Sequence, residues 1–248
     1  MTRNHLKRIS LQSGLLLGTF SLIAAPASAL ASVNATTATS GTSKADQTKI
    51  TYIISHGNTE INRRVTTLNA LSSKISSATK LSASDQSSLS GSVNDELSNL
   101  NSLKTKLDAD TDLATAKSDA QSIITDYRVY ALVVPQVNLV KTADDQQVAE
   151  AKLGDLAVKL QSRITAAGAA GKTVTSLQAQ LSDLNTKIAA AQAISSTIET
   201  NVVALQPSDY DSNHAVLSGD RDQLKTAQAD IQAALSDAKG IVASLKTL

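Results

Sequence analysis

Cysteine is absent from the 248-residue chain, which excludes disulfide bonds, thiol catalysis and thiolate metal sites. Tryptophan is absent as well, the single phenylalanine is Phe20, and the only tyrosines are Tyr52, Tyr127, Tyr130 and Tyr210. So few aromatic rings provide no stacking surface for nucleic-acid bases or for sugars. The fold must therefore be stabilised by the packing of aliphatic side chains.

The chain also lacks a strong excess of charge of either sign, with 23 basic and 22 acidic residues. Three of the basic residues, Arg3, Lys7 and Arg8, lie at the extreme N-terminus, and without them 20 basic residues remain against 22 acidic. Binding to nucleic acid or to an anionic membrane surface normally requires a basic excess. We therefore expect no nucleic-acid partner.

Residues 1–29 are typical of a secretory signal peptide. Basic residues are followed by an apolar run over 15–25 and by the small residues Ala27, Ser28 and Ala29 at the expected cleavage site. Residues 30–43 are small and polar without an apolar period, which predicts a flexible Ser/Thr-rich linker. We expect an exported protein, secreted or held in the cell envelope or at the cell surface, and an uncleaved leader would serve as an anchor.

Residues 127–140, with the sequence YRVYALVVPQVNLV, are apolar on every side of a helix, which is typical of a buried helix. The segment is shorter than the roughly 20 residues of a membrane span, and Arg128 and Lys141 bound it. We therefore expect a core helix and no span in the mature chain. Pro135 removes a backbone donor and would clash with the carbonyl of Ala131, so a kink or local distortion is expected.

Elsewhere apolar residues recur every three or four positions, which predicts amphipathic helices. The predicted helices cover 44–79, 84–107, 113–140, 175–205 and 217–248, with a break over 108–111. The third either ends at a boundary near Thr142 and Asp145, which have capping-box spacing, or continues to about residue 164 as one long helix. A heptad pattern runs through 175–205 and is interrupted by one polar residue, Ser195, and Pro207 ends that helix before a polar connection over 208–213.

These helices predict an all-α fold, an elongated antiparallel helical bundle or coiled coil. We expect two three-helix units, 44–141 and 142–248, that share or abut at a long central helix. An internal repeat supports the division, because residues 71–78 match 160–167 and residues 97–101 match 181–185. The repeat is interpreted as a duplicated helical hairpin.

The runs at 60–65, 107–114 and 127–145 resemble uncharacterised exported all-helical proteins of small bacteria with reduced genomes. The resemblance covers about residues 50 to 165. It implies secretion and helical structure, and it implies no activity.

Four aspartates have the outline of a calcium-binding loop. Asp108, Asp110 and Asp112 alternate with other residues, and Asp119 is the twelfth residue of a loop that starts at Asp108. The pattern departs from such loops because Leu113 stands where glycine makes the sharp turn and because the last ligand is not glutamate. The alternative is that these aspartates cap the next helix and complement its dipole. No cofactor other than calcium is expected.

Catalytic motifs are not found. His56 and His214 are the only histidines after the leader, and neither has a second ligand at metal-binding spacing. No nucleophile elbow, P-loop or glycine-rich dinucleotide fingerprint occurs. We expect no catalytic residue and no enzyme activity.

The sequence therefore predicts a non-catalytic exported structural or interaction protein. It would serve as a spacer, scaffold or surface binding module and would contact a protein partner, or a second copy, through helical faces. Tyr127, Arg128 and Tyr130, beside Pro135, are the first candidates for such contact. One alternative is a calcium-stabilised adhesive or binding module. Another is a cell-envelope hydrolase or its regulator, which requires His56 or His214 beside a carboxylate and a hydroxyl in one cleft.

Overall fold

A computed structural model describes residues 43–248, and within this range every regular element is a helix. The all-α prediction is confirmed. The predicted signal peptide and residues 30–42 of the predicted linker lie outside the described residues. None of the described helices combines the length and the hydropathy that a membrane crossing needs.

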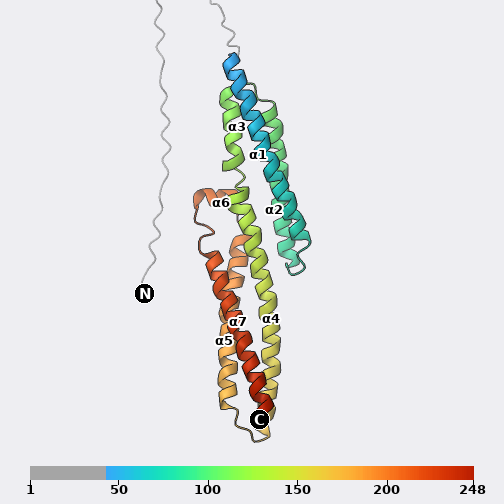
Figure 1. Ribbon diagram of the computed structural model, residues 1–248, viewed down its shortest axis with the longest axis vertical. Coiled ribbons are helices and arrows are strands. Elements are labelled where there is room, and N and C mark those ends of the chain that lie inside the picture. Colours follow the sequence, from blue (N-terminus) through green and yellow to red (C-terminus); the bar gives the residue numbers. More distant parts are fainter. Residues whose placement is uncertain (1–42) are drawn as a thin grey trace, which may run out of the picture. The chain divides into compact units, whose positions relative to one another are not determined.

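The helices follow the predicted order with different bounds (Figure 1). They are α1 (Lys44–Ser76), α2 (Ala83–Asp108), α3 (Leu113–Thr125), the π-helical turn η1 (Val129–Val133), α4 (Val134–Ala169), α5 (Thr175–Val203), α6 (Pro207–Ser212) and α7 (Asp220–Thr247). Short polar side chains begin the first three helices. Ser43, Ser82 and Asp112 each accept a hydrogen bond from the backbone N–H three residues later, at 3.1, 3.0 and 2.9 Å.

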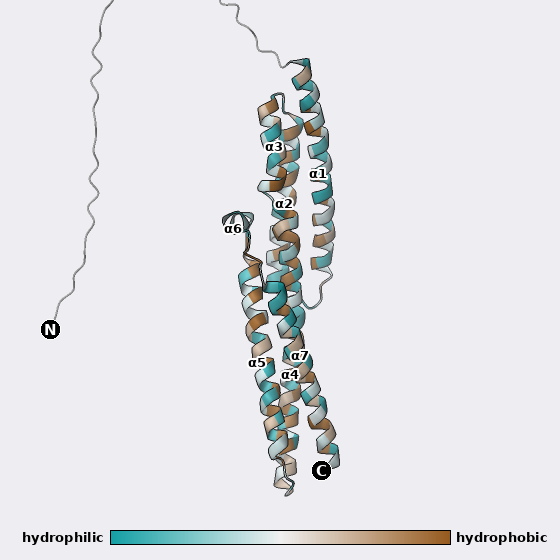
Figure 2. Ribbon diagram, turned by 60° about the vertical axis from the view of Figure 1, so that its left-hand side comes forward, coloured by the Kyte–Doolittle hydropathy of each residue, from teal (hydrophilic) through white to brown (hydrophobic). Residues whose placement is uncertain are grey.

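The helices pack in two sets of three. One set is α1, α2 and α3, and the other is α4, α5 and α7, whose members lie side by side in Figures 1 and 2. Hydrophobic and hydrophilic residues alternate along each helix (Figure 2), as expected where one stripe of a helix faces its neighbours. Successive long helices within a set run antiparallel, so the first and third helix of each set run in the same direction (Figure 1).

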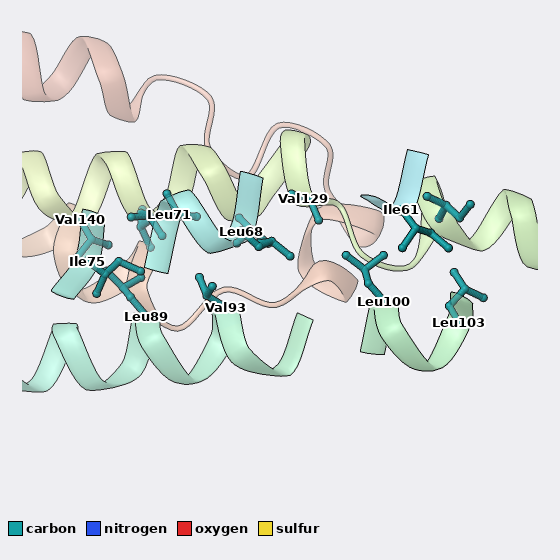
Figure 3. Close-up of a cluster of buried hydrophobic side chains, with 14 of the residues drawn as sticks. Ile61, Leu68, Leu71, Ile75, Leu89, Val93, Leu100, Leu103, Val129 and Val140 are labelled. Atoms are coloured by element: carbon teal, nitrogen blue, oxygen red, sulfur yellow. The ribbon is translucent and has the colours of Figure 1, made fainter. Parts of the chain in front are cut away.

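Two clusters of buried apolar side chains correspond to these sets. The first fills the space among α1, α2 and α3 and continues onto η1, the start of α4 and the adjoining ends of α5 and α7. Figure 3 shows Ile75 of α1, Leu89 of α2 and Val140 of α4 together in this cluster. The second lies only among α4, α5 and α7. The start of α4 is therefore covered by helices of both sets.

The central apolar segment lies in the core, as predicted. The distortion expected at Pro135 is the π-helical turn η1, which ends two residues before this proline. Over η1 the hydrogen bonds span five residues, with the Val134 N–H bonded to the Val129 carbonyl. Tyr130 is the one residue of the segment that is largely exposed, at 45%, and the others are buried or partly buried. The buried residues of the segment are Val129, Leu132, Val133, Gln136, Val137 and Val140.

The helix boundary predicted near Thr142 and Asp145 does not occur. Helix α4 is continuous over 36 residues, and the Thr142 hydroxyl bonds back to the Asn138 carbonyl at 2.8 Å instead of capping a new helix. The chain breaks earlier, between α3 and η1, where Arg128 has a left-handed backbone with φ of 42°. The helix is thus continuous across 142–145, as the one-helix alternative predicts, but neither alternative predicts the break at residues 126–128.

The connection predicted as irregular over 208–213 is mostly helical. The short helix α6 starts at Pro207, and the Asp209 carboxylate accepts a hydrogen bond of 2.8 Å from the Gln206 N–H at its N-terminus. Helix α7 then starts at Asp220, after Gly219 in the left-handed region with φ of 88°. Its observed start is later than the predicted start at residue 217.

Candidate functional site: buried carboxylates where the helices meet

Three carboxylates from three helices converge beside the start of α4. They belong to Asp85 of α2, Asp144 of α4 and Glu199 of α5, and one oxygen of each lies within 4.8 Å of the others. Asp85 and Asp144 are only 3% and 4% exposed, and Glu199 is partly buried. No other group of three carboxylates or imidazoles within residues 43–248 is this close. We call these three residues the carboxylate cluster.

Helix caps position two members of the cluster. Ser82 is the N-cap of α2, and its hydroxyl donates to the Asp85 carboxylate at 2.7 Å. The Ser82 N–H donates to the Asp144 carboxylate at 2.9 Å. The third member, Glu199, accepts a weaker hydrogen bond of 3.3 Å from the Gln147 side-chain amide. The N-terminus of α2 thus contributes the partial positive charge that favours anions at this position.

No basic side chain among the described residues forms a salt bridge with the cluster. The neighbouring lysines, Lys80 and Lys141, instead approach Asp145 at 3.6 and 2.7 Å. The cluster therefore holds more negative charge than its hydrogen bonds offset.

Burial and repulsion between neighbouring carboxylates oppose ionisation of Asp144 and Glu199. Burial, followed by the charges of Asp85 and Glu199, raises the pKa of Asp144 to about 6. Burial also raises the pKa of Glu199, and the nearby Asp85 adds to the effect. The cluster can hold a proton near neutral pH. Its oxygens are of the type that calcium binds, but three ligands are fewer than the 6 to 8 that calcium takes, so water would have to supply the rest.

Further buried polar groups tie the same part of α4 to α5. The Gln136 side-chain amide donates to three carbonyls at the end of α5, at 2.9, 3.0 and 3.2 Å, which belong to Val202, Leu205 and Val203. The Glu150 carboxylate accepts a hydrogen bond from the Ser195 hydroxyl at 3.1 Å from each oxygen. Ser195, the only polar interruption of the predicted heptad, was the one signal in the sequence for these ties.

Two of the four aspartates predicted to bind calcium have other partners. The Asp108 carboxylate accepts hydrogen bonds from Asn58 at 2.6 Å and from Lys104 at 2.8 Å. Asp112 is the N-cap of α3 and accepts from the Thr115 N–H at 2.9 Å. These contacts agree with the alternative interpretation, in which aspartates cap helices and pair at their ends.

The other two aspartates lie near a shared lysine. Asp119 is buried and forms a 2.7 Å salt bridge with Lys106. Burial, followed by the charge of Asp119, raises the pKa of Asp110. No three of Asp108, Asp110, Asp112 and Asp119 come close enough to share one ion, because helix capping and salt bridges direct their carboxylates to different partners. The structure does not bring the predicted calcium ligands together.

Arg128, predicted as an interaction residue, ties the chain break to α6. Its Nε and Nη2 atoms both lie 2.6 Å from Oδ1 of Asp211, and its guanidinium lies 5.5 Å from the ring centroid of Tyr210. These contacts hold the left-handed backbone at residue 128. An internal role is therefore evident for a side chain that sequence analysis assigned to partner contact.

The two neighbouring tyrosines also have internal contacts. The Tyr130 hydroxyl is 3.2 Å from the Thr67 hydroxyl of α1, and Arg64 lies 5.2 Å from the Tyr130 ring centroid. The Tyr127 hydroxyl donates to the Asn99 carbonyl of α2 at 3.4 Å. Contact of Tyr127, Arg128 or Tyr130 with a partner stays a prediction.

The two histidines lie on different elements and beside tyrosines. The rings of His56 and Tyr52 are 6.1 Å apart between centroids, and those of His214 and Tyr210 are 5.1 Å apart. Neither imidazole forms a hydrogen bond with a carboxylate or a hydroxyl in the described part of the chain. The arrangement that the hydrolase alternative requires is not formed there.

Comparison of the chain with protein-family models, curated proteins and solved structures finds no match in any of the three. The resemblance to exported helical proteins therefore stays an expectation, and function must be argued from the residues and their geometry.

Proposed function

We propose that the chain is a non-catalytic exported structural or interaction protein, which acts as a spacer or scaffold and contacts its partners through helical faces. The observation that supports this most directly is the continuity of α4 across the junction of the two helix sets. Its 36 residues run from the shared core into the second core without a break. A continuous helix resists bending better than a loop connection between two bundles.

Side-chain contacts across the same region add to this support. The Gln136 side chain hydrogen-bonds the start of α4 to the end of α5. Just before η1, Arg128 hydrogen-bonds Asp211 of α6, and within η1 Tyr130 hydrogen-bonds Thr67 of α1. Arg128 and Tyr130, which the sequence suggests for partner contact, thus help to fix helices against each other. This use of polar groups is expected of a spacer whose two ends must keep a set separation.

The spacer proposal can be tested by measuring distances between pairs of spin labels. The absence of cysteine allows two labels to be placed at chosen positions without removing native residues. We choose Asn94→Cys on α2 with Thr186→Cys on α5, which are exposed residues of different helix sets. A pair within the second set, Thr186→Cys with Ser236→Cys on α7, is the matched control.

The expected result is one narrow distance distribution for the pair between sets, as narrow as that of the control pair. A broad or multiple distribution for the first pair alone would overturn the spacer proposal. It would mean that the two helix sets move independently despite the continuous helix.

A further inference from the structure

A cavity of about 550 Å³ opens between α4 and the start of α7. This volume lies within the roughly 300 to 1,000 Å³ of typical ligand sites. Four apolar side chains line it, Pro135 and Leu139 from α4, Leu217 from the preceding loop and Leu224 from α7. The cavity does not include the carboxylate cluster.

The rim of the cavity is basic. Arg221 and Lys225 lie one helical turn apart on α7, both are exposed, and no acidic residue lines the cavity. Arg221 forms no hydrogen bond or salt bridge among the described residues, and Lys225 pairs only with the exposed Asp222, at 2.7 Å. Lys74 of α1 bonds to Asn138, which also lines the cavity, and brings a third positive charge close to it.

A buried amide adds an unused acceptor to the lining. Gln146 is 4% exposed, and its Nε2 donates to the Leu224 carbonyl at 2.8 Å. Its Oε1 has no hydrogen-bond partner among the described residues. An unpaired buried carbonyl is unfavourable, but an ionised carboxylate has no donor for it, so this atom contributes nothing to the binding of a carboxylate.

We propose that this cavity binds a small amphipathic carboxylate whose apolar body packs on Pro135, Leu139, Leu217 and Leu224 while its anionic head pairs with Arg221 and Lys225. Apolar walls with few polar groups at one end are characteristic of small-molecule sites. Arginine suits the head group because its planar guanidinium matches a carboxylate with two hydrogen bonds. The inference is independent of the proposed spacer function.

Decanoate, below its micellar concentration, is the probe, and its binding is measured by titration calorimetry on the whole chain. Decyltrimethylammonium and decanol have the same apolar body with a cationic and an uncharged head. We expect decanoate to bind with a ratio of one to one and at least tenfold more tightly than either analogue. We also expect its affinity to fall as the salt concentration rises, because exposed charges are screened.

Two variants locate the site. The double variant Arg221→Gln/Lys225→Gln should raise the decanoate Kd about tenfold or more. Lys239→Gln/Lys246→Gln is the matched control, because it removes the same charge from exposed positions farther along α7 and should change the Kd less than about twofold. Thr142→Trp at the exposed rim keeps both cations and should abolish binding by filling the cavity.

Equal binding of the cationic analogue, or equal Kd values for the two double variants, would overturn the proposal. Unchanged binding by Thr142→Trp would also overturn it, since binding would then occur elsewhere. Far-UV circular dichroism of each variant verifies that the helices are retained. Failure here leaves the spacer proposal intact, because the spin-label distances do not depend on a ligand.

Discussion

The two halves of α4 bury different kinds of residue. Between residues 134 and 150 the buried residues include four polar ones, Gln136, Asp144, Gln146 and Glu150. Beyond residue 150 the buried residues are Leu153, Ala157, Leu160 and Ile164, and all of them are apolar. One uninterrupted helix thus passes from a polar, crowded surrounding into a regular apolar core.

The number of neighbouring helices explains the difference. The second half packs against α5 and α7 in the second core, so a single stripe of its surface is covered and apolar residues suffice there. The first half also meets η1, α1 and the N-terminus of α2, so residues outside the stripe are covered as well. Buried polar groups must then find hydrogen-bond partners, and these partners fix which helices meet at this point.

The largest expected loss of stability comes from a substitution in the second, apolar half of α4. Leu160 is 1% exposed, and Leu160→Ala should lower the free energy of unfolding by about 2 to 5 kcal/mol, through lost burial and the cavity left behind. Val158→Ala is the control on the same helix, since Val158 is 69% exposed and should cost less than about 0.5 kcal/mol. Urea denaturation followed by circular dichroism measures both, and similar losses would contradict the single-stripe description.

A smaller loss of stability is expected from a substitution in the first half of α4, where polar residues are buried. Gln136→Leu retains a side chain of comparable size but removes the side-chain donor to the carbonyls of Val202, Val203 and Leu205 at the end of α5 and just after it. We expect a loss of about 1 to 3 kcal/mol in urea denaturation. The exposed Gln161→Leu on the second half should be nearly neutral. A stabilised Gln136→Leu would show that the polar half gains nothing from its hydrogen bonds.

The smallest effect concerns the pH dependence of the carboxylate cluster. The pKa of Asp144 is raised to about 6 from an ordinary value of 3.8, so the folded chain retains a proton that the unfolded chain releases. The contribution of this group to stability is therefore fully present below about pH 4 and is lost as the pH rises through about 6. Asp144→Asn, which mimics the protonated form, should be more stable than the parent at pH 7 by about 1 to 2 kcal/mol.

The difference between Asp144→Asn and the parent should disappear as the pH falls to about 4. Glu96, whose pKa burial raises to about 7, changes stability in the same direction, but it is present in both proteins and cancels from the difference. Asp155→Asn, at an exposed position of α4, removes the same charge and should show no comparable change with pH. Unfolding midpoints of the parent and both variants, measured at a series of pH values, test this prediction. A stability difference between Asp144→Asn and the parent that stays constant with pH would refute the shared burial of the three carboxylates.

The all-α fold could be predicted from sequence because each helix with few neighbours shows a single apolar stripe. Helix α5 is the clearest case, since eight of its nine predicted heptad positions are buried, while the ninth, Leu205, lies after the end of the helix and is partly buried. The eight buried positions are Leu177, Leu181, Leu184, Ile188, Ala191, Ser195, Ile198 and Val202. The break before η1 could not be predicted, because Arg128 carries no local turn signal and depends on Asp211, 83 residues away.

The carboxylate cluster was missed for a related reason. In the sequence, the pair Asp144 and Asp145 indicates only an acidic, exposed helix end, and Asp85 and Glu199 have no unusual spacing. Their proximity depends on which helix ends meet beside α4, and that is a property of three segments that are distant in sequence.

The π-helical turn η1 determines how α4 is rotated about its own axis relative to the helices that precede it. Its hydrogen bonds span five residues where an α-helix spans four, so the turn contains one residue more than a regular one. Since each residue of an α-helix turns the chain by about 100°, removing one residue from 129–133 would restore a regular ladder and rotate α4 against the helices before it. Each helix would survive such a deletion, but Gln136 and Asp144 would point toward the wrong neighbours.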